Sequence, residues 1–409
     1  MLKLSCFLSQ LRLIKPLTPA GLFTDFWNGW MSVSFPTPVS DGEHVYAMWS
    51  QCQVACYDLN GNRKWLKVFT EDAITARLDQ NYSGSPVLTE DKVIVLFGGK
   101  SGDYIGIRAL DKKTGEQVWY RKQKFKASSH PFPHIVRVKH EGVDAIATGA
   151  SAILRTADGE PVIENLPAPV APPLPHKNEV YITCGSGESS GGGSRMKIVL
   201  TGSGTDLKAK IAWGFLPNKH KSVKWFEFAS KQFPGAPLTE FPYKKAPDTN
   251  VGCIRDNGRI IYGADATKMV DAETGEDMSG KADRKSKMPG GACRGHLTRA
   301  GSYLIGTCGG TIVRVHDLKD PKKVVAANHI GSEYHRKLQL WEMPVEQAVK
   351  NIKELPWLPN AEKWALMQTT PWPQGDRLYI RAKDTLYCIG DPKREYHSPA
   401  GAPPAAKTK

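Results

Sequence analysis

One short phrase recurs along the chain and constrains its fold more than any other feature. It consists of a short apolar strand, an Asp, a tight turn that ends in Gly, and a second strand that can carry a Trp. Copies lie at residues 54–65, 107–119 and 269–276, and the third copy has no Trp. Because such repeats mark small units that bury their faces by stacking on neighbours, the phrase predicts a repeat architecture.

Strand-forming runs of this kind can be traced as seven hairpin-like units. Asp58 and Asp111 are 53 residues apart, and Asp158, taken as the third member of the series, follows after 47. Asp271 and Asp317 are 46 residues apart. These steps are close to the roughly 40–50 residues of one propeller blade. We therefore predict an all-β fold, a β-propeller of four-stranded antiparallel blades, with seven blades counted and eight possible.

The predicted propeller occupies residues 33–390. Residues 1–32 form an irregular segment that we expect to be a truncated or replaced start, and the Pro/Ala/Lys-rich residues 391–409 are expected to be a disordered tail. Two stretches break the repeat. The first is 217–247, rich in Lys, Phe and Pro, and the second is 328–364, which contains a predicted short helix beginning at Pro344.

The residues of the phrase have a structural explanation. Asp and Thr side chains can accept or donate hydrogen bonds within a tight turn, and Gly adopts positive φ without a steric penalty. A Trp on the following strand offers a large apolar area and one N–H for the neighbouring blade. A ligand-stacking platform is the functional alternative for the Trp residues. The predicted blade-docking residues are Trp65, Trp119, Trp213, Asp58, Asp111, Gly115, Asp271 and Gly275.

The phrase resembles the repeat of the pyrroloquinoline-quinone-like (PQQ-like) β-propeller family, within the quinoprotein alcohol dehydrogenase-like superfamily. The resemblance rests on residues 109–119 and 57–65 and on the paired strands at 378–390. That family includes quinone-dependent alcohol and sugar dehydrogenases, non-catalytic scaffolds of the BamB type, and many secreted bacterial proteins. The chain looks most like the last group, and the resemblance implies a periplasmic or secreted location.

Three functions remain open. The first is a non-catalytic scaffold that binds a protein or glycan partner, without a cofactor. The second is a quinone-dependent alcohol or sugar dehydrogenase with pyrroloquinoline quinone and Ca²⁺, although the adjacent cysteine pair found in many such enzymes is absent. The third is a polyanion or polysaccharide binder that uses the basic stretch 208–245, since the net charge is +14. No catalytic, cofactor or metal residue stands out, and no specific nucleic-acid site is expected.

Cysteine spacing and hydropathy indicate whether the chain has metal sites, disulfides or a membrane-spanning helix. The eight cysteines contain no Cys-x-x-Cys motif, so metal-site spacing is absent and buried free thiols are expected. Cys52 and Cys56 lie close together in the sequence and could form a bridge in an oxidising compartment. No apolar run approaches the roughly 20 residues of a membrane-spanning helix, and the N-terminal residues form no convincing signal peptide.

Overall fold

The computed structural model describes most of the repeat region. The described residues are 36–49, 52–69, 85–97, 104–124, 135–149, 151–167, 172–183, 194–218, 224–241, 253–262, 268–278, 297–308, 312–321, 323–329, 371–382 and 385–390. The predicted N-terminal segment, the predicted helix at Pro344 and the predicted C-terminal tail lie outside them. The chain divides into two compact units, Met1–Asn250 (unit 1) and Val251–Lys409 (unit 2), each treated by itself.

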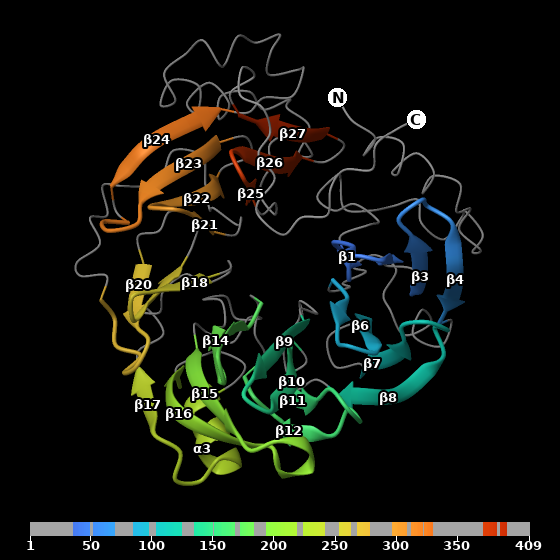
Figure 1. Ribbon diagram of the computed structural model, residues 1–409. Helices are drawn as coiled ribbons and strands as arrows, with labels where there is room; N and C mark the ends of the chain where they lie inside the picture. Colours follow the sequence, from blue (N-terminus) through green and yellow to red (C-terminus); the bar gives the residue numbers. More distant parts are fainter. Residues whose placement is uncertain are drawn as a thin grey trace, which may run out of the picture. The chain divides into compact units, whose positions relative to one another are not determined.

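Unit 1 contains four sheets within the described residues, and each sheet is one blade (Figure 1). Sheet A consists of β1 (Val39–Ser40), β2 (His44–Trp49), β3 (Gln53–Asp58) and β4 (Arg63–Val68). Sheet B consists of β5 (Val87–Leu88), β6 (Lys92–Phe97), β7 (Tyr104–Asp111) and β8 (Gln117–Lys124). Sheet C consists of β9 (Ile135–His140), β10 (Val143–Thr148), β11 (Ala152–Arg155) and β12 (Pro161–Ile163).

Sheet D differs from the others because it has a fifth strand. It consists of β13 (Leu174–His176), β14 (Glu179–Thr183), β15 (Arg195–Thr201), β16 (Lys208–Pro217) and β17 (Leu238–Phe241). A short 3-10 helix, η4 (Gly204–Asp206), joins β15 to β16. The predicted insertion at 217–247 supplies both the helix α3 (Trp225–Gln232) and β17, which pairs with β16 in parallel. Trp225 and Ala229, four residues apart, bury one face of α3 against Leu216.

Unit 2 contains three sheets within the described residues (Figure 1). Sheet E consists of β18 (Cys253–Asp256), β19 (Arg259–Tyr262) and β20 (Lys268–Asp271). Sheet F consists of β21 (Thr298–Ala300), β22 (Tyr303–Cys308), β23 (Ile312–Asp317) and β24 (Val324–His329). Sheet G consists of β25 (Trp372–Gln374), β26 (Arg377–Ala382) and β27 (Thr385–Ile389). In sheet E, one bridge from Val270 to Asp277 stands at the place of a fourth strand.

The seven sheets confirm the predicted all-β propeller and the count of seven blades. Four of the seven sheets have four antiparallel strands each within the described residues. Sheet D has five strands because the insertion adds β17, and sheets E and G have three within the described residues.

The core of unit 1 lies between neighbouring sheets, and β6 shows how the sequence builds it. Because successive side chains of a strand point to opposite faces, alternate residues of β6 enter two different cores. Val93 and Val95 pack with Val54 of sheet A. Ile94 and Leu96 pack with sheet C, in the next core along the chain. All of these side chains are fully buried. Each blade is therefore stabilised mainly by its neighbours.

Candidate functional site

Trp65 and Trp119 each donate a hydrogen bond to the backbone of the next sheet. The indole N–H of Trp65, on β4 of sheet A, donates to the carbonyl of Lys112 in sheet B over 2.9 Å. The indole N–H of Trp119, on β8 of sheet B, donates to the carbonyl of Thr156 in sheet C over 3.0 Å. Both indole side chains are buried. The two contacts repeat one geometry at two successive blade junctions.

Each indole ring also lies against the glycine of the turn that it reaches. A Cβ atom added to Gly115 would lie 2.7 Å from Cδ2 of Trp65, and one added to Gly159 would lie 2.6 Å from Cε3 of Trp119. Both glycines have positive φ, +73° and +74°. The glycine that ends the turn therefore serves two purposes, because it permits the backbone conformation and leaves room for the incoming ring.

The turn aspartates are held within their own turns. Asp111 Oδ1 accepts hydrogen bonds from the backbone N–H groups of Lys113 and Thr114, at 2.9 and 2.8 Å. Asp271 Oδ1 accepts in the same way from the N–H groups two and three residues later, both at 2.8 Å. The N–H of Gly275 donates to the Asp271 carbonyl over 2.8 Å. The hydrogen bond from the Thr114 backbone N–H lowers the pKa of Asp111.

Asp58 occupies a turn that is one residue shorter. Its carboxylate accepts hydrogen bonds from the side chain and the backbone of Asn62, and it forms an ion pair with Lys64 at 3.0 Å. The hydrogen bonds from Asn62 hold the pKa of Asp58 well below its usual range. Asp58 therefore shapes its turn as a carboxylate, as Asp111 does.

The structure corrects the alignment of the third unit. The N–H of Gly115 donates to the carbonyl of Asp111, and the N–H of Gly159 donates to the carbonyl of Arg155. Arg155, and not Asp158, thus stands at the position of Asp111. Asp158 closes this turn differently, through an ion pair with Arg155 at 2.7 Å. The alignment of Asp158 with Asp58 and Asp111 was therefore wrong, because aspartate can stabilise a tight turn from more than one position.

Trp213, on β16, is buried and contacts aromatic side chains of its own sheet. Its ring centroid lies 6.3 Å from that of Tyr181 and 6.0 Å from that of Phe215. Tyr181 in turn donates a hydrogen bond to Glu179 over 2.5 Å. The structure therefore places Trp213 in an aromatic cluster inside sheet D.

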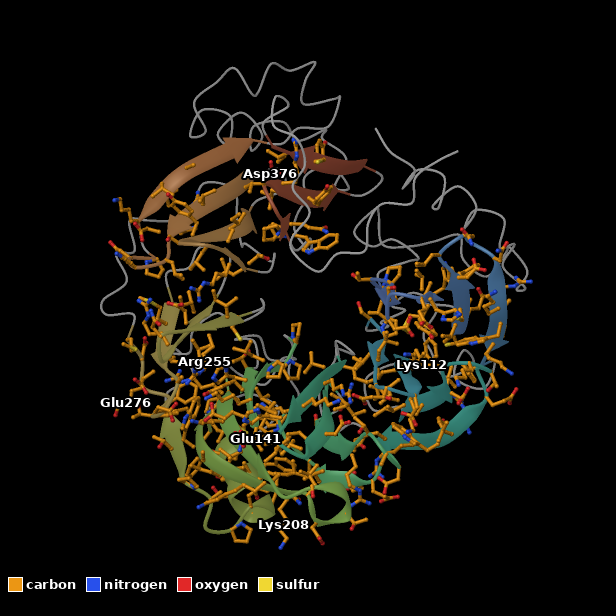
Figure 2. The ribbon with its side chains drawn as sticks, in the orientation of Figure 1. Lys112, Glu141, Lys208, Arg255, Glu276 and Asp376 are labelled. Atoms are coloured by element: carbon orange, nitrogen blue, oxygen red, sulfur yellow. The ribbon has the colours of Figure 1, made fainter. Side chains whose placement is uncertain are left out.

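Ion pairs join the sheets of unit 1 beside the turns. Asp41 of sheet A pairs with Lys112 of sheet B at 2.6 Å, and Figure 2 shows Lys112 where these two sheets adjoin. Glu90 of sheet B pairs with Arg137 of sheet C at 2.6 Å and also with Lys139. The hydrogen bonds from Lys139 and Arg137 lower the pKa of Glu90 to about 2. These pairs cross the same junctions as the two indoles.

The Glu90 contacts predict an acid-dependent loss of stability. Since the pKa of Glu90 in the folded chain lies below its ordinary 4.5, its contribution is present above pH 4.5 and is lost as the pH falls towards 2. Glu90→Gln should lower the free energy of unfolding at pH 7 by no more than about 1 kcal/mol, because the pair is solvent-exposed. The difference from wild type should vanish near pH 2 in urea titrations. A constant difference across this range would contradict the assignment.

The Trp119 contact predicts a cost for a substitution that keeps an aromatic ring. Trp119→Phe removes the donor to Thr156 and leaves a buried carbonyl unsatisfied, so we expect a loss of about 1–3 kcal/mol in the free energy of unfolding. The midpoint of urea unfolding, followed by circular dichroism, measures this loss. A change below about 0.5 kcal/mol would show that the hydrogen bond adds nothing to the packing of the ring.

The described residues contain no group of three or more His, Cys, Asp or Glu side chains placed to hold a metal ion. Cys52 and Cys56 are both buried, and no disulfide joins them in this structure. Burial raises the pKa of the Cys56 thiol to about 11. Within the same part of the chain, no helix has the length and apolar character needed to cross a membrane.

The two faces of sheet G carry different side chains. Leu378, Ile380 and Tyr387 pack against the core of sheet F. The opposite face carries Trp372 and Tyr379, which are cross-strand neighbours with ring centroids 5.8 Å apart. Cys388, paired with Tyr379, is exposed on the same face. Trp372 is 60% exposed, the largest exposure among the large apolar side chains of the described residues. We call these three residues the aromatic face of sheet G.

Sequence reasoning missed the aromatic face. Its signal was Trp372 on the strand before the Leu378–Ile380 run, where a pattern of alternating side chains would place it away from the core. It also missed Asp256, whose carboxylate is 2% exposed and pairs with Arg259 at 3.1 Å and with Arg299 of sheet F at 3.0 Å. Arg259 further donates to the carbonyl of Leu318 in sheet F over 3.1 Å.

The known structures to which this chain is similar share little of its sequence. No family model matches the chain, and no curated protein matches it. The chain is similar to the crystal structure of BamB from Moraxella catarrhalis, with 13% identity and a TM-score of 0.48 over 88% of this chain and 83% of that one. It is also similar to the computationally designed Ika8 protein, with 10% identity and a TM-score of 0.41 over 90% and 99%. Identities this low leave the function to be argued from the residues of this chain.

Proposed function

We propose that the protein is a non-catalytic propeller scaffold that binds a protein partner through the aromatic face of sheet G. The observation that supports this most is the exposure of Trp372 beside Tyr379. Trp and Tyr are enriched at protein interfaces and dominate their binding energy, because a rigid ring buries a large area at little cost in conformational entropy. A Trp that is 60% exposed leaves most of that area for a partner.

The geometry of the pair favours a protein over a glycan. The planes of Trp372 and Tyr379 are tilted by 42° to one another, so the two rings do not form the coplanar surface on which successive sugar rings could stack. A tilted pair instead suits an apolar side chain inserted against one ring. Exposed Cys388 extends the same face with a further apolar group.

We assign the residues of the repeated phrase a structural role in the blades and not a role in ligand binding. Trp65 and Trp119 donate to the neighbouring backbone, and their rings cover glycines, so neither offers an open stacking surface. The aspartates hold their own turns. In this proposal, Trp65 and Trp119 hold neighbouring blades together and the turn residues stiffen each blade, so that exposed positions such as Trp372 are rigidly presented.

Site-specific crosslinking tests the proposal. A photoreactive amino acid placed at residue 372 of the full chain should capture one discrete partner in the cells that produce the protein. The same group at Leu59, which is 56% exposed on a turn of sheet A, should not capture that partner. Purified partner should then bind Trp372→Ala at least about tenfold more weakly than wild type. Equal capture at both positions, or unchanged binding of the Trp372→Ala variant, would exclude the aromatic face.

The competing functions have tests of their own. If purified protein gains quinone absorbance and reduces a dye in the presence of alcohol or sugar after addition of pyrroloquinoline quinone and Ca²⁺, the scaffold proposal is wrong. For the polyanion reading, retention on a polyanion column should be lost when the lysines at 208–245 are replaced. One of these, Lys224, is already paired with Glu227 at 2.9 Å.

A further inference from the structure

The turn between β18 and β19 in unit 2 consists of an Asn–Gly pair. Asn257 and Gly258 lie between Asp256 and Arg259, which are paired across the two strands. Both turn residues have positive φ, 44° and 72°, as a two-residue hairpin turn of type I′ requires. Asn257 is exposed to solvent. The pair therefore lies at the end of a tight hairpin, where water reaches the side chain of Asn257.

An Asn–Gly pair can react with itself. The backbone nitrogen of Gly258 can attack Cγ of Asn257, because a glycine has no Cβ to hinder the approach. A bond forms between these two atoms, the nitrogen loses its proton to water, and the side-chain nitrogen of Asn257 leaves as ammonia. Water then opens the cyclic imide at either carbonyl. Opening at Cγ gives aspartate, and opening at the main-chain carbonyl gives isoaspartate, whose backbone runs through Cβ and Cγ.

A second Asn–Gly pair, in sheet A, shows what favours the reaction at Asn257. Asn60 is also exposed, but the N–H of Gly61 donates to the carbonyl of Asp58 over 3.0 Å. The N–H of Asn60 donates to Asp58 Oδ1, also over 3.0 Å. Both hydrogen bonds must open before the Gly61 nitrogen can attack. In contrast, the N–H of Gly258 has no acceptor within the described residues, and only its carbonyl is held, by the N–H of Ala272 over 2.7 Å.

Isoaspartate in this turn would act on the contacts of its neighbours. The carboxylate of Asp256 pairs with Arg259 at 3.1 Å and with Arg299 of sheet F at 3.0 Å. An isoaspartyl residue lengthens the backbone of the turn by one methylene group. Asp256 and Arg259 would then lose their register, and the carbonyl of Gly258 would move away from the N–H of Ala272. Both changes weaken sheet E where it meets sheet F.

We propose that Asn257–Gly258 is a site of spontaneous deamidation and that its isoaspartyl product loosens the junction between sheets E and F. The reaction needs only water as co-reactant. It involves no residue of the aromatic face of sheet G, so this proposal and the proposed function can fail independently.

The reaction rates at the two turns test the site. The full chain is incubated at mildly alkaline pH, and peptide mass spectrometry follows deamidation over time. In the folded chain Asn257 should react at least about fivefold faster than Asn60, because two hydrogen bonds hold the turn of Asn60. In urea the two rates should become similar, since both turns are open. Hydroxylamine, which cleaves cyclic imides, should cut the folded chain after residue 257.

Two results would overturn the assignment of the site. One is equal deamidation of Asn257 and Asn60 in the folded chain. The other is a difference of the same size in urea, which would show that the neighbouring sequence, and not the folded turn, sets the rates. The third Asn–Gly pair, Asn28–Gly29, lies outside the described residues and does not enter the comparison.

Hydrogen exchange tests the consequence for the junction. The fraction that carries isoaspartate at residue 257 can be separated by ion exchange, because it has gained a negative charge. Its Ala272 amide should exchange faster than in the fresh chain, since the acceptor at Gly258 has moved. Freshly prepared Asn257→Asp adds the same charge with an ordinary backbone and should exchange as the wild type does. Unchanged exchange in the isoaspartyl fraction, or equally fast exchange in Asn257→Asp, would contradict the proposed effect of the longer backbone.

Discussion

Gly115→Ala is expected to lower the free energy of unfolding of unit 1 by about 2–5 kcal/mol. The backbone at Gly115 has a φ of +73°, which costs an L-residue about 1–2 kcal/mol. The new Cβ would also lie 2.7 Å from Trp65, and overpacking of this kind typically adds about 1–3 kcal/mol. Because the ring comes from the neighbouring sheet, the substitution should loosen the junction between sheets A and B. The midpoint of urea unfolding measures the total.

Gly42→Ala is the matched control for this experiment. Gly42 has a φ of +94°, but an added Cβ would meet nothing within 4 Å. It should therefore cost only the backbone part, about 1–2 kcal/mol. In a Trp65→Ala background, Gly115→Ala should become as mild as Gly42→Ala, since the clash has been removed. If Gly115→Ala were no worse than the control in the wild-type chain, the ring and the glycine would not be packed as described.

Asp256→Ala is expected to lower the stability of unit 2 by about 3–5 kcal/mol. The carboxylate of Asp256 is 2% exposed and is the partner of both Arg259 and Arg299. Removing it leaves Arg259, whose side chain is only 19% exposed, without this neutralising charge. Because Arg299 belongs to sheet F and Asp256 to sheet E, the loss should appear as early hydrogen exchange at the junction of these sheets.

Glu273→Ala is the control for Asp256→Ala. It removes an ion pair of unit 2 whose carboxylate is exposed. Glu273 is 61% exposed and pairs with Arg255 at 3.2 Å. Its loss should cost about 1 kcal/mol or less. Similar unfolding midpoints for the two variants would mean that Asp256 acts as an ordinary surface charge.

The sequence was sufficient to predict the turns, because the hydrogen bonds that shape them join residues that are close together in the chain. Asp111 accepts hydrogen bonds from the residues two and three positions later, so the turn can be predicted from neighbouring residues in the sequence. The blade count follows from the same local pattern. Trp65 is different, because its acceptor lies 47 residues away and becomes visible only when the two sheets are in register.

Other features depend on tertiary contacts that no local sequence pattern predicts. The insertion at 217–247 contains Phe and Pro residues that do not alternate, yet it supplies β17, whose parallel pairing with β16 is set by the packing of α3 beneath it. Asp256 is an ordinary turn residue in the sequence, and its burial requires Arg299 from the next sheet. The exposure of Trp372 likewise depends on which face of sheet G is covered.

The hydrogen bonds between sheets affect how the sequence of such a chain can diverge in evolution. Three of them end on a backbone carbonyl in a turn of the next sheet, at Lys112, Thr156 and Leu318. The donor is Trp in two cases and Arg in the third. A carbonyl is supplied by every amino acid, so the receiving blade needs no particular side chain at that position. Blades joined in this way can be duplicated, exchanged or allowed to diverge in sequence as long as each one carries a donor for its neighbour.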